Sequence, residues 1–358
     1  HRAYDGSVTV AVAAAGGTVT GAFAGDDVSV DLAGVSSGTM ADKHVGTGKP
    51  VTVLGVALTG TDAGNYVLAG IDAVTVDITP RTLTVNGLTG SNRAYNQSLN
   101  VSVNTASGVL AGAVAGDTLE LAQRTVTGQL ADRHVGTAKP VAVGGSSLLL
   151  RGPDAANYRV DDAVATVNIT PATVYFYADY YGTGRDKVYD GNDLAAVTPY
   201  AYINFVGNYL LIGSTTLGQD NLTLSYDAPR YGDKNVAYSG STVTSKTITV
   251  ANAVLGGTEA GNYVLDNTST TTSGRITPKP LSVTGVTAEN RPYDGTVVVN
   301  VDVTAAAVDT SGVLGSDVVN VSLPSSGTVQ GTVADKTAGT AKPVAVPGFS
   351  LSGADAGN

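Results

Sequence analysis

The chain has 358 residues and a formal net charge of −10, and 42% of its residues are apolar. This apolar content supports folded cores and excludes a disordered tail, while the acidic balance argues against nucleic acid and anionic membranes as partners. The chain has no Cys, which excludes a disulfide framework, and no apolar stretch long enough for a membrane helix. Its 45 Gly and its abundant Val and Thr predict strands and turns with little helix.

Four short patterns recur along the chain in a constant order. The first is a tyrosine-led turn, which begins as RAYDG around Tyr4 and returns at Tyr95, Tyr189 and Tyr293. The second ends in Gly-Thr-x-Lys-Pro, the third reads acid-Ala-x-Asn-Tyr, and the fourth contains Ile-Thr-Pro. The four tyrosines lie 91, 94 and 104 residues apart, which is the length of a small domain and too long for a solenoid repeat.

The Ile-Thr-Pro pattern sets the predicted boundaries at Pro80, Pro171 and Pro278, because proline gives up a ladder hydrogen bond and ends a strand. We number the repeats in chain order: repeat 1 (residues 1–80), repeat 2 (81–171), repeat 3 (172–278) and repeat 4 (279–358). Repeats 2 and 3 look complete, whereas repeat 1 lacks its first strand and repeat 4 its last strands, as in a window cut from a longer array. We expect each repeat to bury its own core with few contacts to its neighbours, and the four to stack over roughly 120–160 Å.

Repeat 2 alternates apolar and polar residues almost throughout, as half-buried strands do. The expected strands lie at 83–87, 98–103, 118–122, 125–130, 140–150, 157–160 and 164–169. Leu99, Val101 and Val103 are expected to share one buried face. The pattern predicts an all-β fold, a tandem array of four antiparallel, immunoglobulin-like β-sandwich repeats. A β-grasp fold is the alternative, because GVLAGAVAGD at 108–117 could form a helical turn.

The recurring tyrosines have a structural interpretation. Asp-Gly follows Tyr4, Tyr189 and Tyr293, and this dipeptide is a hairpin signal that requires positive φ. We expect each phenol to pack over the edge of its core and to hydrogen-bond the backbone, as in a tyrosine corner, with ligand binding as the alternative. Repeat 2 has Asn-Gln after Tyr95, which a turn tolerates and an aspartate-dependent site does not.

The acid-Ala-x-Asn-Tyr pattern predicts a short turn in which the acid caps free N–H groups and Asn ends the turn. Structural calcium is the alternative, although the spacing of a calcium loop is absent. A Lys and an Asn also recur in every repeat, as Lys49 and Asn65, Lys139 and Asn157, Lys246 and Asn262, and Lys342 and Asn358. One hypothesis is an isopeptide bond between each pair beside the neighbouring acid, and the other is an exposed Lys next to an acidic turn.

Residues that would indicate an enzyme are not grouped in this sequence. The three His are His1, His44 and His134, and neither of the last two has a plausible Ser or metal partner set. The string GTGKP lacks the spacing of a phosphate loop. We therefore expect no enzyme, and assign no catalytic, cofactor-binding or metal-binding residue.

Repeat 3 differs from the others, since residues 175–238 hold 11 of the 17 Tyr. One interpretation is that a larger sandwich needs larger core residues, such as Tyr175, Tyr177 and Phe205. The other is a recognition surface, because tyrosine rings are rigid, have one polar end and stack on sugar rings. The candidate ligand-binding residues are Tyr180, Tyr181, Tyr200, Tyr202 and Tyr209.

The strings YDG, GTGKPV, DAGNYVL and ITPRTLTV together resemble the YDG-type repeats of very large bacterial exoproteins, the filamentous-haemagglutinin-like adhesins exported by two-partner secretion. The resemblance covers the whole chain, with repeat 3 as a divergent member. It implies a secreted or cell-surface filament for adhesion or biofilm formation, and it names no catalytic residue. We expect a monomeric stalk that holds a binding region away from the cell, with host or biofilm glycans as candidate partners. A carbohydrate-binding module in repeat 3 is the alternative.

Overall fold

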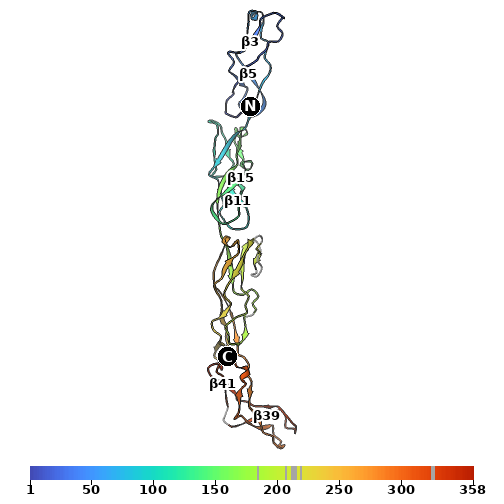
Figure 1. Cartoon of the computed structure of the whole chain (residues 1–358), viewed down its shortest axis with the longest axis vertical. Helices are drawn as coiled ribbons and strands as arrows, with labels where there is room; N and C mark the ends of the chain where they lie inside the picture. The colour runs from blue at the N-terminus through green and yellow to red at the C-terminus, as the bar shows by residue number, and fades with distance from the viewer. Residues whose placement is uncertain (184, 206–207, 211–215, 218–219, 324–326) are drawn as a thin grey trace. The chain divides into compact units, whose positions relative to one another are not determined.

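The computed structural model describes residues 1–183, 185–205, 208–210, 216–217, 220–323 and 327–358 (Figure 1). The chain divides after Pro171 into two compact units, the N-terminal unit (1–171) and the C-terminal unit (172–358). The division coincides with the expected boundary between repeats 2 and 3, so each unit holds two repeats. Strands and loops build both units, which confirms the all-β prediction, and the described helices are single 3-10 turns. None of these described helices has the length and apolar character needed to cross a membrane.

The N-terminal unit contains short strands and three 3-10 turns. In repeat 1 the elements are β1 (Arg2–Ala3), β2 (Thr9–Ala11), β3 (Ser29–Asp31), β4 (Ser37–Met40), β5 (Gly46–Val53), β6 (Ala57–Thr59), η1 (Ala63–Asn65) and β7 (Val74–Thr79). In repeat 2 they are β8 (Arg81–Asn86), β9 (Thr89–Gly90), β10 (Arg93–Ala94), β11 (Asn100–Asn104), β12 (Val109–Ala111), β13 (Glu120–Leu121), β14 (Thr125–Leu130), β15 (Gly136–Val143), η2 (Gly145–Ser147), β16 (Leu150–Arg151), η3 (Ala155–Asn157), β17 (Tyr158–Val160) and β18 (Ala163–Thr170).

Each repeat of the N-terminal unit is built on one main sheet. The strand order is β1-β7-β5-β4-β2 in repeat 1 and β10-β18-β15-β14-β11-β9 in repeat 2. Most neighbours are antiparallel, but the short strand before each tyrosine turn runs parallel to the last strand of its repeat, with Arg2 opposite Ile78 and Arg93 opposite Ile169. The described strands β8 to β18 pair only with one another, and β8 itself runs parallel to β17. Repeat 2 therefore closes on itself.

The alternation in repeat 2 predicts most of its buried residues correctly. Val101 and Val103 of β11 are buried, as expected, but Leu99 lies just before the strand and is exposed. The segment 108–117 contains strand β12 followed by a turn, in which the N–H of Asp117 bonds the carbonyl of Val114 at 3.2 Å. The helical turn on which the β-grasp alternative depended is therefore wrong.

The core of repeat 1 continues into repeat 2. Tyr4, Ile78 and Val51 of repeat 1 form one buried cluster with Leu83 and Tyr158 of repeat 2. The expectation that every repeat buries a separate core with few contacts to its neighbour is therefore wrong inside this unit. Apolar side chains from both repeats are removed from water at the same boundary, which makes the burial of one repeat depend on the other.

The C-terminal unit has the same character. In repeat 3 the elements are β19 (Ala172–Tyr177), β20 (Lys187–Val188), β21 (Tyr200–Phe205), β22 (Asn208–Leu210), β23 (Thr216–Leu217), β24 (Asp220–Asn221), β25 (Thr223–Ser225), β26 (Arg230–Tyr231), β27 (Tyr238–Ser239), β28 (Thr242–Val243), β29 (Lys246–Val250), β30 (Val254–Gly256), η4 (Ala260–Asn262), β31 (Tyr263–Leu265), β32 (Thr270–Gly274) and β33 (Ile276–Thr277). In repeat 4 they are β34 (Val283–Thr284), β35 (Thr287–Ala288), β36 (Val298–Asp302), β37 (Ala307–Val308), η5 (Thr310–Gly312), β38 (Asn320–Ser322), β39 (Thr328–Val333), β40 (Val344–Ala345) and β41 (Ser350–Ser352).

Strand β19 carries aromatic residues on both of its faces. It pairs in parallel with β31 and antiparallel with β21, and Phe176 points into the core of repeat 3. Tyr175 and Tyr177 alternate with Phe176 and are exposed, so the expectation that these tyrosines fill the core is wrong. The side chain of Phe205 lies outside the described residues.

Candidate functional site at the repeat junctions

In repeats 1, 2 and 3 the tyrosine of the recurring turn is positioned by its own repeat. The short strand before it is paired in parallel with the last strand, and the tyrosine N–H extends that pairing. Tyr4 N–H bonds the carbonyl of Thr79 at 2.9 Å, and Tyr189 N–H bonds the carbonyl of Thr277 at 2.8 Å. The Ile-Thr-Pro pattern thus supplies the backbone that fixes the tyrosine pattern.

The turn after the tyrosine depends on one residue with positive φ. Gly6 has φ 78°, and Asp5 Oδ1 accepts the N–H of Ser7 at 2.9 Å. In repeat 2, Gln97 adopts φ 64° without a glycine, and Asn96 replaces the aspartate. The turn does not form the expected hairpin, because β1 and β2 lie at opposite edges of their sheet.

The hydroxyl of Tyr4 binds the following repeat. Tyr4 is 0% exposed, and its hydroxyl donates to Asp117 Oδ2 of repeat 2 at 2.8 Å. Tyr158 donates to the same oxygen at 2.6 Å, and its ring meets that of Tyr4 edge-on with centroids 5.3 Å apart. The expectation that the phenol bonds the backbone is therefore wrong, because its acceptor is a carboxylate 113 positions away.

A lysine of repeat 1 binds the same carboxylate. Lys43 Nζ lies 2.6 Å from Asp117 Oδ1, 3.8 Å from Asp154 Oδ1 and 5.7 Å from the centre of the Tyr4 ring. The Asp117 side chain is only 2% exposed. A buried charge is tolerated when it is paired and its lone pairs are bonded, and Asp117 meets this condition with three side-chain donors.

An asparagine completes the junction. Asn157 is buried, and its Oδ1 accepts the N–H of Val45 at 3.1 Å while its Nδ2 lies 3.2 Å from His44 Nδ1. Its own N–H bonds the carbonyl of Asp154, whose Oδ2 accepts the N–H of Thr118 at 2.8 Å. We expected the acid of this pattern to cap its own 3-10 turn, and this is wrong. The side chain of Asp154 instead bonds the loop that carries Asp117.

The same contacts join repeats 3 and 4 in the C-terminal unit. Tyr189 donates to Asp317 Oδ2 at 2.8 Å, and Lys234 Nζ lies 3.0 Å from Asp317 Oδ1. The N–H of Val236 bonds Asn358 Oδ1 at 2.9 Å. We call the side that supplies the Tyr, the Lys and the N–H the donor face. The side that supplies the Asp and the Asn is the acceptor face.

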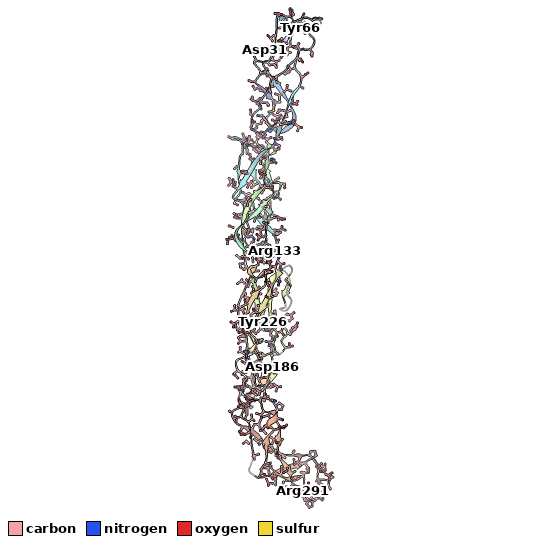
Figure 2. All side chains as sticks on the ribbon, viewed as in Figure 1. Asp31, Tyr66, Arg133, Asp186, Tyr226 and Arg291 are labelled. Carbon is pink, nitrogen blue, oxygen red and sulfur yellow. The ribbon has the colours of Figure 1, made fainter. Side chains whose placement is uncertain are left out.

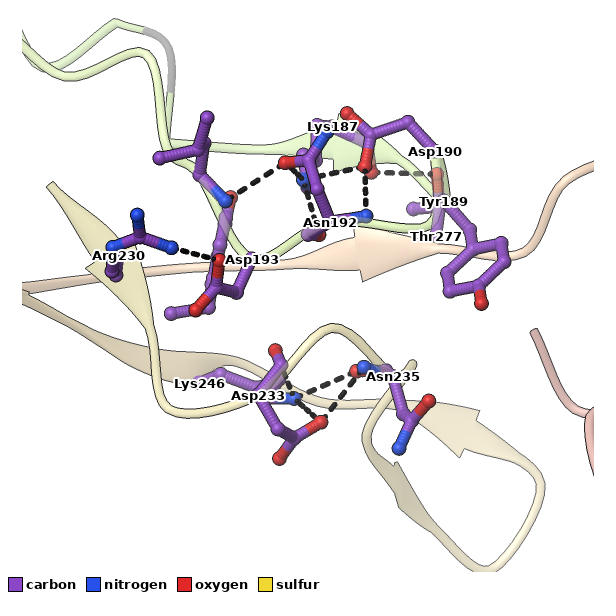
Figure 3. Close-up of polar contacts among 12 residues, drawn as sticks. Lys187, Tyr189, Asp190, Asn192, Asp193, Arg230, Asp233, Asn235, Lys246 and Thr277 are labelled. Carbon is purple, nitrogen blue, oxygen red and sulfur yellow. Dashed lines mark hydrogen bonds and ion pairs between the residues drawn. The ribbon is translucent and has the colours of Figure 1, made fainter. Parts of the chain in front are cut away.

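The recurring lysine of the Gly-Thr-x-Lys-Pro pattern shapes the donor face. Lys49 Nζ bonds the carboxylate of Asp42 and the carbonyl of His44, the latter at 2.7 Å, and so holds the loop that presents Lys43. Figure 3 shows the same arrangement for Lys246, Asp233 and Asn235. The corresponding pairs are Lys139 with Asp132 and Lys342 with Asp335.

These partners differ from the ones proposed for the lysines. The isopeptide hypothesis paired Lys139 with Asn157, yet the ammonium is bound to Asp132 and the amide to the preceding repeat. The side chain of Lys139 is mostly buried, so the hypothesis of an exposed lysine is also wrong. Asn65 is exposed, and Asn262 and Asn358 end the same turns in the C-terminal unit.

The electrostatics of the junction keep its charges fixed near neutral pH. Burial acts to raise the pKa of Asp117, but the hydrogen bonds from Lys43, Tyr158 and Tyr4 outweigh it and lower the pKa. Burial, together with the bond to Asp117, raises the pKa of Tyr158 to about 12. The bonds to Asp117 and Tyr4 raise the pKa of Lys43. A charged pair with neutral phenols beside it is suited to holding two surfaces together.

Within the described part of the chain, no three His, Asp or Glu side chains are gathered so that they could hold a metal ion. The acids of the third pattern bind backbone N–H groups, as Asp62 binds that of Asp27 at 2.9 Å.

Four of the five candidate ligand-binding tyrosines lie close together on repeat 3. Tyr200 of β21 stacks on Tyr177 of β19 with centroids 5.0 Å apart, and Tyr180 meets Tyr200 edge-on at 5.1 Å. Tyr181 is exposed and lies 4.7 Å from Tyr180. Tyr202 pairs across the strands with Tyr175. The backbone of Tyr209 is opposite Tyr202 in β22, and its side chain lies outside the described residues.

The residues that sequence reasoning missed are the acceptor aspartates and the donor lysines. Each acceptor Asp follows a glycine by one or two positions in a loop, as in Gly116-Asp117 and Gly315-Ser-Asp317. Each donor Lys directly follows an Asp, as in Asp42-Lys43 and Asp233-Lys234. Both signals recur in the sequence, but a recurring position does not reveal its partner in another repeat.

Comparison with protein families assigns three of the repeats. The sequence model of the YDG domain matches residues 1–73, 79–166 and 277–358. These segments correspond to repeats 1, 2 and 4, and the unmatched segment contains most of the divergent repeat 3. No curated protein matches the chain.

Proposed function

Because the chain belongs to the YDG domain family, we propose that it is a stalk segment of a large bacterial adhesin, of the filamentous-haemagglutinin-like kind exported by two-partner secretion. In this proposal the segment is secreted or displayed on the cell surface, and it extends a binding region for adhesion or biofilm formation. Its repeats are immunoglobulin-like sandwiches that space other parts of the protein and catalyse no reaction. The observation that carries the proposal is the junction of tyrosine, lysine and aspartate, which recurs in both compact units.

The chemistry of the junction supports a spacing role. Hydrogen bonds are directional, so three donors on one buried carboxylate restrict both tilt and rotation between neighbouring repeats. In a tandem array, stability is the sum of the repeats and of the interfaces between neighbours, so each such interface stiffens and stabilises the whole.

Small-angle X-ray scattering of dilute protein tests the stalk. We expect a maximum dimension of roughly 120–160 Å, and a compact globule would contradict the proposal. The double variant Lys43→Glu, Lys234→Glu places a negative charge against Asp117 and against Asp317. We therefore expect its scattering curve to indicate a more flexible chain than that of the unchanged protein. Arg124→Glu reverses a charge on repeat 2 outside the junction and serves as the control.

A second candidate function is glycan binding by the tyrosine cluster of repeat 3. It is favoured by the adjoining rings of Tyr177, Tyr180, Tyr181 and Tyr200, of which the first three are exposed. The test is binding of the chain to a glycan array. Binding that is lost in the double variant Tyr180→Ala, Tyr181→Ala and kept in the control Tyr293→Ala would support this second function. An array without any signal would remove it.

A further inference from the structure

The residue after each donor lysine bonds the asparagine of the acceptor face. In the junction of repeats 1 and 2, His44 Nδ1 lies 3.2 Å from Nδ2 of the buried Asn157. In the junction of repeats 3 and 4, Asn358 Nδ2 donates to Oδ1 of Asn235, which Figure 3 labels, at 3.0 Å. His44 and Asn235 therefore accept the same hydrogen bond with different chemical groups.

The two positions have the same backbone surroundings, so they can be compared directly. The N–H of His44 bonds Asp42 Oδ1 at 2.8 Å, and the N–H of Asn235 bonds Asp233 Oδ1 at 2.7 Å. Both His44 and Asn235 are exposed, which leaves room for either side chain at either position. The difference at this position lies in the group that accepts the hydrogen bond.

The hydrogen bonds of Asn157 require a neutral His44. Asn157 Oδ1 accepts the N–H of Val45 at 3.1 Å, so its Nδ2 faces the imidazole and can only donate. His44 Nδ1 must then be the acceptor, which is possible in the neutral ring and impossible in the imidazolium. The carboxamide oxygen of Asn235 accepts at any pH, whereas histidine side chains change their charge between about pH 8 and pH 5.

Other charged and titratable groups surround His44. They are Asp42, Lys43 and Lys49 of its own loop, the phenols of Tyr4 and Tyr158, and Asp117 and Asp154 of repeat 2. The bond from Lys49 lowers the pKa of Asp42, and the bond to the acceptor carboxylate raises the pKa of Lys43. Carboxylates and ammonium groups of this kind stay charged in mild acid, so the imidazole is the group that changes. Asp42 is on the same loop as His44 and attracts an imidazolium whether the junction is open or closed.

Proton uptake by His44 favours the open junction. The imidazolium places an N–H against the amide of Asn157, which is only 2% exposed and loses its acceptor. The attraction to Asp117 and Asp154 is weakened by Lys43, whose Nζ lies 2.6 Å and 3.8 Å from their carboxylates, and by the solvent around the exposed ring. The loss of the hydrogen bond is therefore the larger effect.

We propose that the residue after the donor lysine sets the pH dependence of a junction. His44 makes the junction of repeats 1 and 2 loosen as the pH falls from about 7.5 to about 5.5, and Asn235 keeps the junction of repeats 3 and 4 insensitive to pH over this range. The inference rests on the proposed function, because it describes how the junction that carries that function is regulated. A stalk of such repeats has joints that differ in their response to acid.

Hydrogen exchange at two backbone amides tests this proposal within one molecule. The N–H of Val45 bonds Asn157 Oδ1 and the N–H of Val236 bonds Asn358 Oδ1, so their exchange reports the opening of the two junctions. After correction for the pH dependence of the chemical exchange step, we expect the protection of Val45 to fall at least about threefold between about pH 7.5 and about pH 5.5. The protection of Val236 should change by less than about twofold.

Exchange of the two side chains gives matched variants. His44→Asn should make the protection of Val45 independent of pH, and Asn235→His should give Val236 the pH dependence that Val45 has in the unchanged protein. Circular dichroism shows whether each variant is folded. His1→Asn is the control, because it removes another exposed histidine of repeat 1, which pairs with an aspartate of β7 and not with repeat 2.

The remaining histidine, His134, directly follows the Arg133 that Figure 2 labels and is unchanged in every variant, so its titration is common to all measurements. Protection of Val45 that does not change with pH overturns the proposal. So does a pH dependence that persists in His44→Asn, or one that Asn235→His fails to create. The stalk is tested separately by scattering at neutral pH, so an extended chain without this pH dependence would contradict the inference and leave the proposed function standing.

Discussion

At the residue scale, the tyrosine of the recurring turn lies in two very different environments. Tyr4 and Tyr189 are buried because a following repeat supplies an aspartate and apolar cover, and Tyr293 is exposed. The burial of Tyr4 and Tyr189 therefore depends on the following repeat, although the backbone of each is fixed by its own repeat.

Replacement of Tyr4 by Phe removes only the hydroxyl. We expect Tyr4→Phe to lower the free energy of unfolding of the N-terminal unit by about 1–2 kcal/mol, because a charge-assisted bond to a buried carboxylate is lost. Urea denaturation measures the change. Tyr293→Phe, at the same position of repeat 4, should change the stability by less than about 0.5 kcal/mol. Equal effects of the two substitutions would show that the bond to Asp117 does not contribute.

The lysine-held aspartates predict an acid dependence of stability. The bond from Lys139 lowers the pKa of Asp132, and the bonds from Lys49 and Lys246 do the same for the aspartates of their loops. A carboxyl whose pKa is lowered in the folded state contributes stability above its unfolded pKa, about 3.9, and loses it as the pH falls through the folded value.

We therefore expect the urea midpoint to be nearly constant from pH 7 to about pH 5 and to fall steadily below about pH 4. Asp132→Asn should be less stable at pH 7 and should show a shallower decline in acid, because one of the titrating groups is absent. A midpoint that rises on acidification would be inconsistent with this assignment.

At the element scale, a glycine in the middle of the main sheet sets how closely its interior packs. A Cβ at Gly128 of β14 would lie 2.5 Å from Val141 Cγ1 and 3.2 Å from Val103 Cγ2. The corresponding glycines of repeats 1 and 4, Gly38 and Gly331, face a valine at 2.4 and 2.5 Å. The absence of a side chain at this position is what lets the valines of the neighbouring strands fill the core.

Gly128→Ala should therefore destabilise repeat 2 by about 1–3 kcal/mol through overpacking. The loss is measured as a lower thermal or urea midpoint. Gly64→Ala is the matched control, since Gly64 has open space around it and repeat 2 already has Ala156 at the equivalent position. If the two variants had similar midpoints, the close packing at Gly128 would not limit stability.

The same elements show what the sequence can predict. Alternation identifies strand β14 and the buried Val101 and Val103, because a half-buried strand has a period of two. It does not say which face is inside when both faces are aromatic, so it leaves Tyr177 open between the core and the surface; in the structure Phe176 fills the core and Tyr177 is exposed. The Tyr4–Asp117 bond was not predictable, because its partners belong to different repeats and no local period relates them.

At the scale of the whole molecule, repeats 1 and 2 are expected to unfold as one cooperative body. Their shared cluster contains Tyr4 and Ile78 from one repeat and Leu83 and Tyr158 from the other. Hydrogen exchange, read separately for residues 1–80 and 81–171, should give similar opening free energies for the protected amides of the two.

Loss of the acceptor carboxylate should uncouple the unfolding of repeat 1 from that of repeat 2. In Asp117→Asn we expect the amides of repeat 1 to exchange faster than those of repeat 2, because Lys43 loses its charged partner. Asp26 of repeat 1 occupies the position that Asp117 has in repeat 2, but it is exposed. Asp26→Asn should therefore leave the exchange rates of the two repeats similar to each other. Uniform loss of protection over both repeats in Asp117→Asn would mean that the shared apolar cluster alone couples them.

The parallel pairing at the start of each complete repeat has a mechanical consequence. Three consecutive residues of β8 are in register with Tyr158–Val160 of β17, and the first three residues of β19 are in register with β31 in the same way. Tension applied to the two ends of such a repeat pulls the paired strands past each other lengthwise. Their hydrogen bonds then share the load and must rupture together, whereas a hairpin opens one bond at a time. A chain anchored at one end and pulled at the other by flow would resist extension at these pairs before the loops of its sheets gave way.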